Sequence, residues 1–480
     1  MKIGRDHSRV AVNRRRVDFQ KPTHCSNTIL RAGCIMASIT MKNPPKRSRA
    51  AKPLVILLQG PVGPFFSELR QQLIARGFDV IKVNFNGGDR FFSGSSDDIN
   101  FVGSPPEWAA WLTDFMRLRR PAAITLFGDS RPYHLEALRV ASDQRVAVWS
   151  LEEGYIRPNY IACERGGNNA LSPIRWSARN PEFHPVARNL SGGNHIPAMA
   201  MFAALHTLAK SVSANRFRGN VSHKSRSLPS ECVRWALNVA RKVAYAESNR
   251  RVMSRIRDGQ LCRYFIVALQ VHDDLNLLRH GRGWTMERLI EETARSFSQH
   301  APAGHLLLFK VHPLDRGHLP YRKLVTNAAM AYGCRGRFTV VDDGPIGQMI
   351  RHSDGVITVN STSGLLALQQ GKPLLVLGDA VYSSAALNTI SPTSPDQLHA
   401  FWKTARSARR CDVYHFTDRL LCESLIEGSF YAQPFRSAAC AGVADRIQNG
   451  VRSEHILALP DLLDEPHHGI VEFEHEQLAG

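Results

Sequence analysis

The chain alternates short, uninterrupted apolar runs with segments whose apolar residues recur every three or four positions. The first run, Leu54–Leu58, is followed by helical spacing over Phe65–Ile74 and then by a second run, Val80–Phe85. Apolar runs of this length, without polar alternation, are typical of strands buried on both faces of a parallel sheet. The order strand, helix, strand therefore predicts one β-α-β unit, with Gly77 ending its helix.

The same pattern recurs along the chain in two sets. The first set, over 53–195, includes the runs Ala123–Phe127 and Arg145–Trp149. The runs of the second set, over 259–400, are Arg263–Leu269, His305–Phe309, Phe338–Val341, Gly355–Val359 and Leu374–Leu377. We therefore predict an α/β fold with two Rossmann-like domains, an N-terminal one over 53–195 and a C-terminal one over 259–400, facing each other across a ligand cleft.

Three further segments lack this alternation. Residues 1–52 are rich in Arg, Lys, Ser and Pro, which predicts a basic flexible extension. Residues 196–258 combine helical spacing with many arginines, which predicts a basic helical linker between the domains. Residues 401–480 are predicted to form C-terminal helices and an acidic tail. No apolar run approaches the roughly 18 residues that a membrane-spanning helix needs.

The positive charge is concentrated in two of these segments. The 480 residues carry 61 Lys and Arg against 42 Asp and Glu, a formal net charge of +19. Residues 1–52 hold 13 of the basic residues with 2 acidic ones, and residues 201–260 hold 12 with 3. The rest of the chain is close to neutral. Such blocks favour contact with a polyanion or an anionic membrane, although a merely solvated tail accounts equally well for the first one.

Composition and cysteine usage narrow the class of protein. An apolar fraction of 43% excludes a mainly disordered or fibrous chain. The nine cysteines are scattered and form no C-x-x-C pair, which predicts reduced thiols and neither a disulfide framework nor a zinc site. No apolar core of a signal peptide follows the basic start. We therefore expect a cytoplasmic protein.

A hydroxyl-rich turn follows the apolar run Gly355–Val359. Ser361, Thr362 and Ser363 stand in succession before Gly364, at the start of a helical segment. The free N–H groups and the dipole of a helix start favour an anion, and small side chains let a phosphate approach closely. An ordinary Ser/Thr helix cap is the alternative. Three hydroxyls at the expected ligand edge favour the phosphate site.

The dipeptide His312-Pro313 follows the run His305–Phe309. Proline fixes the backbone, so the imidazole is expected to project from the strand end, where it can donate a hydrogen bond to an anion. A structural histidine is the alternative. Its place in the same half of the chain as the hydroxyl turn favours an anion-binding role as strongly as a structural one.

Two adjacent acidic pairs end predicted strands. Glu152 and Glu153 precede Gly154 in the first domain. Two neighbouring carboxylates are costly to bury as ions, so one of them is expected to face the cleft, where it could act as a general base or a nucleophile. A solvated turn is the alternative. Asp342 and Asp343 have the same form in the second domain and could be a turn or a metal-binding pair.

Several common signatures are absent. The segment Gly60–Gly63 does not match G-x-G-x-x-G, and Pro61 and Pro64 remove two amide donors, so a dinucleotide site is disfavoured. No Walker A, H-E-x-x-H or G-x-S-x-G motif occurs. No RNP, KH or zinc-finger signature accompanies the basic blocks, so nucleic acid is not an expected partner.

Several longer motifs occur in a fixed order over about residues 54–430. They are Leu58–Phe66, Lys82–Asp89, Leu126–His134, Glu152–Pro158, Glu164–Asn168, Leu269–His272, Phe309–Gly317 and Asn360–Gly364. With these motifs the chain resembles capsule polysaccharide biosynthesis proteins of the KpsS/LipB type. The resemblance implies a GT-B-like glycosyltransferase that adds the first β-linked Kdo from CMP-Kdo to a phosphatidylglycerol-type lipid, at the cytoplasmic face of the inner membrane.

The resemblance also implies roles for individual residues. It implies that Glu152, Glu153 and His312 are catalytic, which ranks this acidic pair above Asp342-Asp343. The residues implied for donor binding are His272, Lys310, Pro313, Ser361, Thr362, Ser363 and Gly364. Those implied for the acceptor or the cleft are Gln59, Gly60, Gly63, Asn86, Gly87, Asp129, Arg131 and Arg157.

The partners expected from the resemblance are CMP-Kdo, an anionic phospholipid acceptor with its membrane surface, and other capsule synthesis and export proteins. No cofactor or metal is expected, since His312 and the hydroxyl turn can meet the charge of the leaving CMP. Two alternatives stay open. One is a GT-B enzyme that uses another nucleotide sugar, and the other is a non-catalytic basic adaptor of the capsule assembly and export complex.

Overall fold

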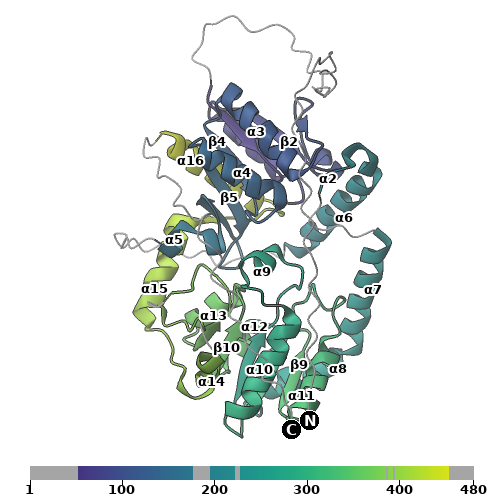
Figure 1. Ribbon diagram of the computed structural model, residues 1–480, viewed down its shortest axis with the longest axis vertical. Helices are drawn as coiled ribbons and strands as arrows, with labels where there is room; N and C mark the ends of the chain where they lie inside the picture. The colour runs from purple at the N-terminus through teal and green to yellow at the C-terminus, as the bar shows by residue number, and fades with distance from the viewer. Residues whose placement is uncertain (1–51, 177–194, 222–227, 385–386, 393–394, 453–480) are drawn as a thin grey trace, which may run out of the picture. The chain divides into compact units, whose positions relative to one another are not determined.

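The architecture is seen in a computed structural model, which describes residues 52–176, 195–221, 228–384, 387–392 and 395–452 (Figure 1). The predicted basic extension, apart from its last residue, and the predicted acidic tail lie outside the described residues. Within the described part of the chain, no helix has both the length and the apolar character needed to cross a membrane. The seven cysteines in that part are all free thiols.

The first α/β unit is built on a seven-stranded sheet with the order β12-β6-β5-β4-β1-β2-β3. Its strands are β1 (Leu54–Leu57), β2 (Asp79–Asn84), β3 (Ile99–Asn100), β4 (Ala123–Phe127), β5 (Ala147–Glu153), β6 (Tyr160–Arg165) and β12 (Leu425–Glu427). Strands β1 to β5 pair in parallel, whereas β6 is antiparallel to its neighbours β5 and β12. Strands β1, β2, β4 and β5 match the predicted apolar runs, whereas β3 and β6 were not predicted.

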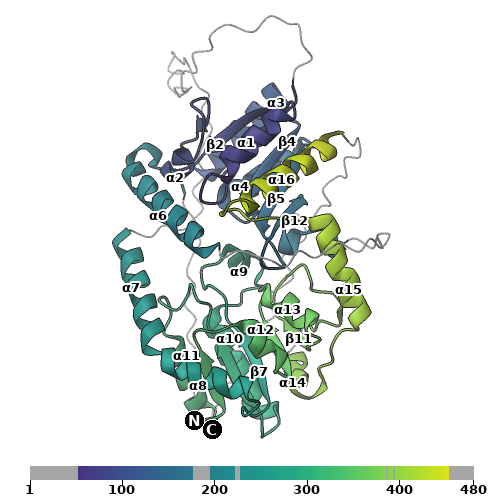
Figure 2. The same cartoon turned by 180° about the vertical axis from the view of Figure 1, so that it is seen from behind.

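Helices cover both faces of this sheet (Figures 1 and 2). They are α1 (Phe65–Ala75), α3 (Pro105–Arg119), α4 (Pro132–Asp143) and α16 (Phe435–Arg452), while the short α2 (Gly87–Phe91) follows β2 and the short α5 (Pro173–Trp176) contributes Ile174 to the core of the second sheet. Successive side chains of a strand point to opposite faces, and β1 shows the result. Val55 and Leu57 belong to a core with α1 and α16, while Ile56 and Leu58 belong to a core with α3 and α4. This two-sided burial explains the continuous apolar run.

The second α/β unit has a five-stranded, fully parallel sheet with the order β11-β10-β7-β8-β9. Its strands are β7 (Tyr264–Ala268), β8 (Leu306–Lys310), β9 (Phe338–Val341), β10 (Gly355–Thr358) and β11 (Leu374–Val376). Its helices are α9 (Leu275–His280), α10 (Met286–His300), α11 (Tyr321–Ala331), α12 (Ile346–Arg351), α13 (Ser363–Gln369), α14 (Pro395–Thr404) and α15 (Arg410–Arg419). Alternate residues of β7 again enter two different cores. The predicted α/β fold with two parallel-sheet units is confirmed.

The segment between the two sheets is helical, as its spacing predicts. It consists of α6 (Ile196–Val212), α7 (Leu228–Ala244) and α8 (Ala246–Arg257). The first of these packs beside α2 in the first unit, and the last packs beside β9 and α12 in the second unit.

The end of the chain returns to the first unit, which the sequence did not predict. Strand β12 pairs with β6, and α16 packs along α1, where Arg436 forms an ion pair of 2.6 Å with Glu68. Residues after 401 therefore include an edge strand and a covering helix of the first sheet, in addition to helices. A strand of three residues carries no readable periodicity, and the partner of an amphipathic helix cannot be read from that helix alone.

Replacing Ile447 on α16 with Ala tests this return. Ile447 is fully buried in the core that contains α1, so its truncation should lower the free energy of unfolding by about 2–5 kcal/mol in denaturant titrations. The exposed Asn449 on the same helix is the matched control, and N449A should change it by less than about 0.5 kcal/mol. Equal effects of the two variants would show that α16 is not part of this core.

Candidate functional site

Polar and charged residues gather where the parallel strands of the first sheet end. Glu152 and Glu153 are the last two residues of β5, and the loop Gly128–Arg131 follows the neighbouring β4. A Cβ built on Gly128 would lie 3.5 Å from Glu152 Oε2 and 3.7 Å from Arg131 Nε, so the loop passes directly beside the carboxyl. The acidic pair thus ends its strand, as predicted from the sequence.

The surroundings of Glu152 favour the protonated, uncharged form of its carboxyl. Loss of hydration raises the pKa of its carboxyl to about 8, and the N–H of Glu153, which donates to Glu152 Oε1 at 3.1 Å, offsets only part of this effect. The negative charges of Asp274 and Asp129 act in the same direction as burial. Near neutral pH this carboxyl therefore exchanges its proton readily, which suits a general acid or base.

Asp89 holds together the loops that follow β1 and β2. It was not among the site residues expected from the sequence. Its carboxylate accepts hydrogen bonds from Gln59 Nε2 (3.3 Å), Asn86 Nδ2 (2.9 Å) and the Phe85 N–H (3.1 Å). His206 Nε2 on α6 lies 3.4 Å from the same group, and the hydrogen bond from His206 helps to hold the pKa of Asp89 below its usual range despite full burial. Asp89 ends one of the motifs that carry the resemblance, which was the available signal.

Three glycines predicted to lie at the acceptor side are explained by close packing. A Cβ on Gly60 would lie 2.8 Å from the Phe66 ring, and one on Gly63, whose φ is +107°, would lie 2.7 Å from Phe202. A Cβ on Gly87 would lie 2.4 Å from Ser213 Cβ. Gly63 and Gly87 therefore let α6 and its following residue approach the loops after β1 and β2, and Gly60 leaves room for the Phe66 ring of α1.

The other predicted residues of the first unit divide into buried and exposed ones. Asp129 is buried and accepts hydrogen bonds from the Asn168 N–H (2.7 Å) and from Ser130 Oγ (2.9 Å), so it fixes neighbouring loops. Arg131 is partly buried, and loss of hydration lowers the pKa of its guanidinium, opposed by Asp89 and Glu152. Arg157 is exposed, and its positive charge helps to lower the pKa of His312 in the second unit.

His312 is neutral over the physiological pH range. Burial lowers the pKa of its imidazole to about 4, and the charges of Lys310 and Arg157 act in the same direction. The Leu314 N–H donates to His312 Nδ1 at 3.2 Å. Since Nδ1 accepts this bond, the ring proton resides on Nε2, which can donate a hydrogen bond to a ligand.

Lys310 lies two residues before His312, at the end of β8. Its side chain is only 4% exposed, burial lowers its pKa to about 8, and Nζ donates to the Val311 carbonyl at 2.7 Å. The charge is therefore enclosed directly beside His312. The Pro313 carbonyl accepts a hydrogen bond of 2.9 Å from Asn238 on α7, which holds the loop from outside.

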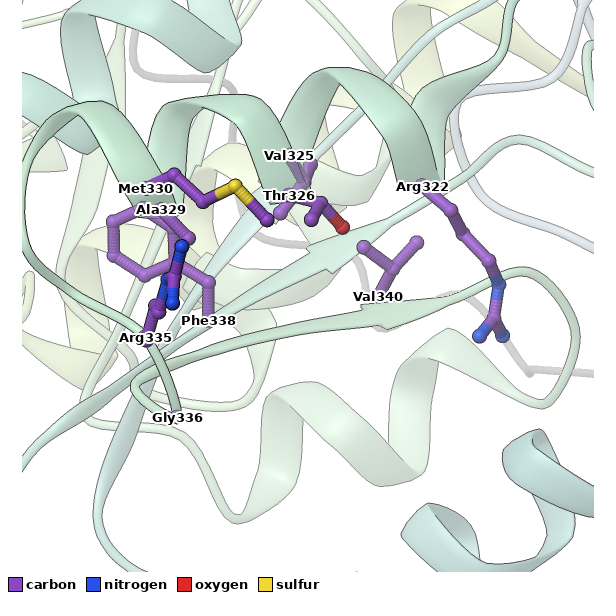
Figure 3. A pocket seen from close by; sticks show the side chains of 9 residues that line it. All are labelled: Arg322, Val325, Thr326, Ala329, Met330, Arg335, Gly336, Phe338 and Val340. Carbon is purple, nitrogen blue, oxygen red and sulfur yellow. The ribbon is translucent and has the colours of Figure 1, made fainter.

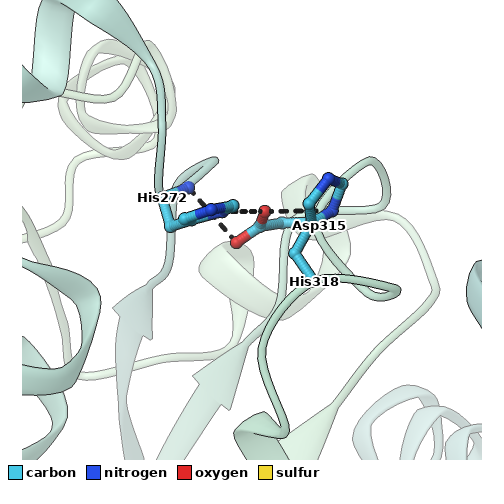
Figure 4. Close-up of side chains that lie close together, drawn as sticks. All are labelled: His272, Asp315 and His318. Carbon is cyan, nitrogen blue, oxygen red and sulfur yellow. Dashed lines mark hydrogen bonds and ion pairs between the residues drawn. The ribbon is translucent and has the colours of Figure 1, made fainter. Parts of the chain in front are cut away.

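His272 lies in a cluster with Asp315 and His318 (Figure 4). His272 Nδ1 is 2.7 Å and His318 Nδ1 is 3.5 Å from Asp315 Oδ1, and the His272 N–H donates to Oδ2 at 3.2 Å. Asp315 is fully buried and also accepts a hydrogen bond from Tyr321. In the described part of the chain this is the group whose ligand atoms are close enough to hold a metal ion. The same contacts equally well orient His272 toward the strand ends.

The hydroxyl turn follows β10, as predicted. Ser363 Oγ donates to Ser361 Oγ at 3.0 Å, and Thr362 caps α13 without a side-chain hydrogen bond to it. A Cβ on Gly364 would lie 2.4 Å from the Tyr382 hydroxyl, which donates to the Ser361 carbonyl. Packing against Tyr382 therefore accounts for Gly364, while the three hydroxyls lie partly accessible in front of the strand end.

Residues of the two units contact each other near these strand ends. Ser130 Oγ lies 3.4 Å from His280 Nε2, and Asn169 Oδ1 accepts from the Val381 N–H at 3.1 Å. Asp274 of the second unit raises the pKa of Glu152 in the first unit, and Arg157 of the first unit lowers the pKa of His312 in the second. The acidic and the basic candidates thus each respond to a charge from the other unit.

Other candidates lie elsewhere. Asp342 is paired with Arg322, 2.6 Å from its Nη2, and its backbone bonds to Asn249 and Arg316, so it serves as a structural contact.

A cavity of about 490 Å³ lies between α11 and β9 (Figure 3). Its lining residues are Arg322, Val325, Thr326, Ala329, Met330, Arg335, Gly336, Phe338 and Val340, and no predicted site residue is among them.

Comparison with known proteins identifies relatives. The family model for "Capsule polysaccharide biosynthesis protein" matches residues 122–431. The capsule polysaccharide export protein KpsS of Escherichia coli is 34% identical over 382 residues, which cover 78% of this chain and 96% of KpsS. The capsule polysaccharide modification protein LipB of Neisseria meningitidis serogroup B is 30% identical over 403 residues, covering 79% and 92%.

A solved structure with a similar course of the chain is "Thermosulfurimonas dismutans KpsC, beta Kdo 2,7 transferase". It is 13% identical, with a TM-score of 0.38, and the match covers 83% of this chain and 99% of that one.

The raised pKa of Glu152 makes a testable contribution to stability. Its folded-state value of about 8 lies above the ordinary 4.5, so the stabilisation is fully present below pH 4.5 and is lost as the pH rises through about 8. In E152Q this loss is absent. The melting temperature of E152Q relative to that of the unsubstituted protein should therefore rise between pH 5 and pH 8, whereas substitution of the exposed Glu427 by Gln should leave the difference constant. A constant difference for E152Q would contradict the burial of Glu152.

Proposed function

Since the chain belongs to the capsule polysaccharide biosynthesis protein family, we propose that it is a glycosyltransferase that moves Kdo from CMP-Kdo to a phosphatidylglycerol-type lipid. The product would be the first unit of the lipid linker of a capsular polysaccharide. The observation that carries this proposal is the pairing of two differently tuned groups: a neutral imidazole donor beside an enclosed lysine in one unit, and a carboxyl that titrates near pH 8 in the other.

The second unit provides what a departing nucleotide requires. Breaking the bond between the sugar and CMP leaves a second negative charge on the phosphate, and preorganised donors stabilise such a charge most where water is excluded. We assign this role to His312 Nε2–H, Lys310 and the hydroxyls at Ser361–Ser363. They supply the charge compensation from side chains of the chain itself.

The first unit provides a base for the acceptor. A lipid hydroxyl becomes a nucleophile when a positioned group removes its proton, and a base works best when its pKa lies near the working pH. Glu152 has this property, and Glu153 beside it accepts a hydrogen bond from Tyr431. We assign proton removal to Glu152 and its positioning to Glu153 and Arg131.

The proposed acceptor places the protein at a membrane surface. A lipid head group is presented only at the bilayer interface, so the enzyme works as a peripheral protein on the inner face of the inner membrane. The excess of basic residues over 201–260 favours attachment to anionic lipids. Other capsule synthesis and export proteins would receive the product there.

Replacing His312 by Ala tests the function and the site together. Purified protein is incubated with CMP-Kdo and short-chain phosphatidylglycerol, and Kdo-lipid is measured by mass spectrometry. H312A should lower the rate at least about 100-fold, because a donor to the leaving phosphate is lost. The exposed His352 is the matched control, and H352A should leave the rate unchanged.

The outcomes of this assay separate the alternatives. Absence of Kdo-lipid with the unsubstituted protein, with transfer from a UDP-sugar instead, would overturn the donor assignment. Absence of transfer from any nucleotide sugar would favour the adaptor function. Equal rates of H312A and the unsubstituted protein would remove His312 from the site.

A further inference from the structure

Exposed large apolar side chains concentrate on two consecutive helices. Of such side chains in the described part of the chain, more than half lie on α6 and α7. They are Ile196, Met201, Leu205, Leu208 and Val212 on α6, and Val233, Trp235, Leu237, Val239 and Val243 on α7. Both helices lie on the same flank of the molecule in the two opposite views (Figures 1 and 2). Scattered surface hydrophobics need no explanation, but a concentration of this kind marks an interaction site.

Helix α7 is amphipathic, and its polar side faces the protein. Asn238 is buried and bonds to the Pro313 carbonyl and to Arg316, at 2.9 and 3.1 Å. Arg241 donates to the Arg316 and Leu319 carbonyls at 2.6 and 2.9 Å. The apolar side therefore faces outward, opposite to the usual arrangement of a surface helix.

The outward face of α7 is broad and continuous. At about 100° per residue, its exposed Val, Trp, Leu, Cys and Ala side chains cover roughly 200° of the circumference. A seam for one partner helix is much narrower than this. The exposed Lys242 lies at one border of the arc, next to Trp235. Aromatic and lysine side chains at the edge of an apolar face are typical of helices that lie in a membrane interface.

Helix α6, which packs on the first unit, also turns apolar side chains outward. Its inner side is fixed by Phe202, which packs at Gly63, and by His206, which bonds to the buried Asp89. Its exposed positions recur every three to five residues from Ile196 to Val212, and all except Ser211 are apolar or Pro.

Basic residues flank both apolar faces. Arg216 and Arg218 follow α6 with exposed side chains, and the exposed Arg250 and Arg251 lie on α8, where both pair with Glu247 and leave one net positive charge. Basic residues beside an inserted apolar face each add about 1 kcal/mol of attraction to an anionic bilayer surface. A second copy of this chain would bring the same positive groups together, which disfavours self-association through this face.

We propose that the outer faces of α6 and α7 dock on an anionic lipid bilayer, with the Trp235–Val243 face inserted at the level of the head groups. The docking goes beyond charge attraction, because the apolar faces supply an interaction that salt does not screen. It rests on the proposed function only for the identity of the lipid acceptor.

The test measures vesicle binding by flotation, without any sugar donor. The vesicles contain phosphatidylcholine with one quarter phosphatidylserine, an anionic lipid that is not the proposed acceptor. The unsubstituted protein should bind, and part of the binding should persist in 0.5 M salt. The triple variant W235S/V239S/V243S should bind at least tenfold more weakly and lose the salt-resistant part. L118S, at an equally exposed apolar position on α3, should bind as the unsubstituted protein does.

A second readout locates the contact. Trp235 is 54% exposed, whereas Trp108, Trp149, Trp284 and Trp402 are each less than 10% exposed. Trp111 on α3 is only partly buried, so brominated lipids should quench the fluorescence of the unsubstituted protein much more strongly than that of W235F. Equal binding of the triple variant, absence of quenching, or a dimer that the triple variant converts to a monomer without vesicle binding would each overturn the proposal.

The outcomes stay distinguishable from those of the proposed function. If docking fails while Kdo transfer to short-chain phosphatidylglycerol persists, the docking proposal falls and the function stands. If vesicle binding holds while Kdo transfer fails, the docking proposal stands and the proposed function falls. The melting temperature of the triple variant should match that of the unsubstituted protein, since the substituted side chains point outward.

Discussion

Loss of hydration at the ends of two parallel sheets is the constraint on which the rest of the site depends. It raises the pKa of Glu152 to about 8, lowers that of Lys310 to about 8 and lowers that of His312 to about 4. Each group is thereby shifted toward its neutral form, because burial always disfavours charge. A site of this kind gains most from a ligand that brings a phosphate, since the ligand's charge then restores the favourable pairing.

The fold creates this constraint through its parallel strands. Within each sheet the parallel strands end at the same edge; these are all strands of the second sheet and β1 to β5 of the first. The loops that carry the candidate site residues therefore gather at that edge of each sheet. Close packing supports the loops: Gly63 and Gly87 admit α6, and Asn238 on α7 holds Pro313. The two helices proposed to contact lipid are thus the same ones that hold the loops of the candidate site.

The sequence predicted the parts whose pattern is local. Continuous apolar runs located the parallel strands except β3, and missed the antiparallel β6, while the motifs at Glu152, His312 and Ser361 were correctly placed at strand ends. Three features depended on tertiary contacts and could not be predicted. Strand β12 is too short to show periodicity, the hydrogen bonds to Asp89 come from separate loops, and the helical spacing of α7 does not reveal which of its faces the protein covers.

In the proposed reaction the second unit holds the nucleotide while the carboxyl of the first unit acts on the acceptor. Calorimetric titration of CMP into the unsubstituted protein, E152Q and H312A separates these two roles. E152Q should bind CMP with unchanged affinity, whereas H312A should bind it at least about tenfold more weakly because a hydrogen bond to the phosphate is lost. Unchanged affinity in H312A, or loss of CMP binding in E152Q, would show that the roles are not divided in this way.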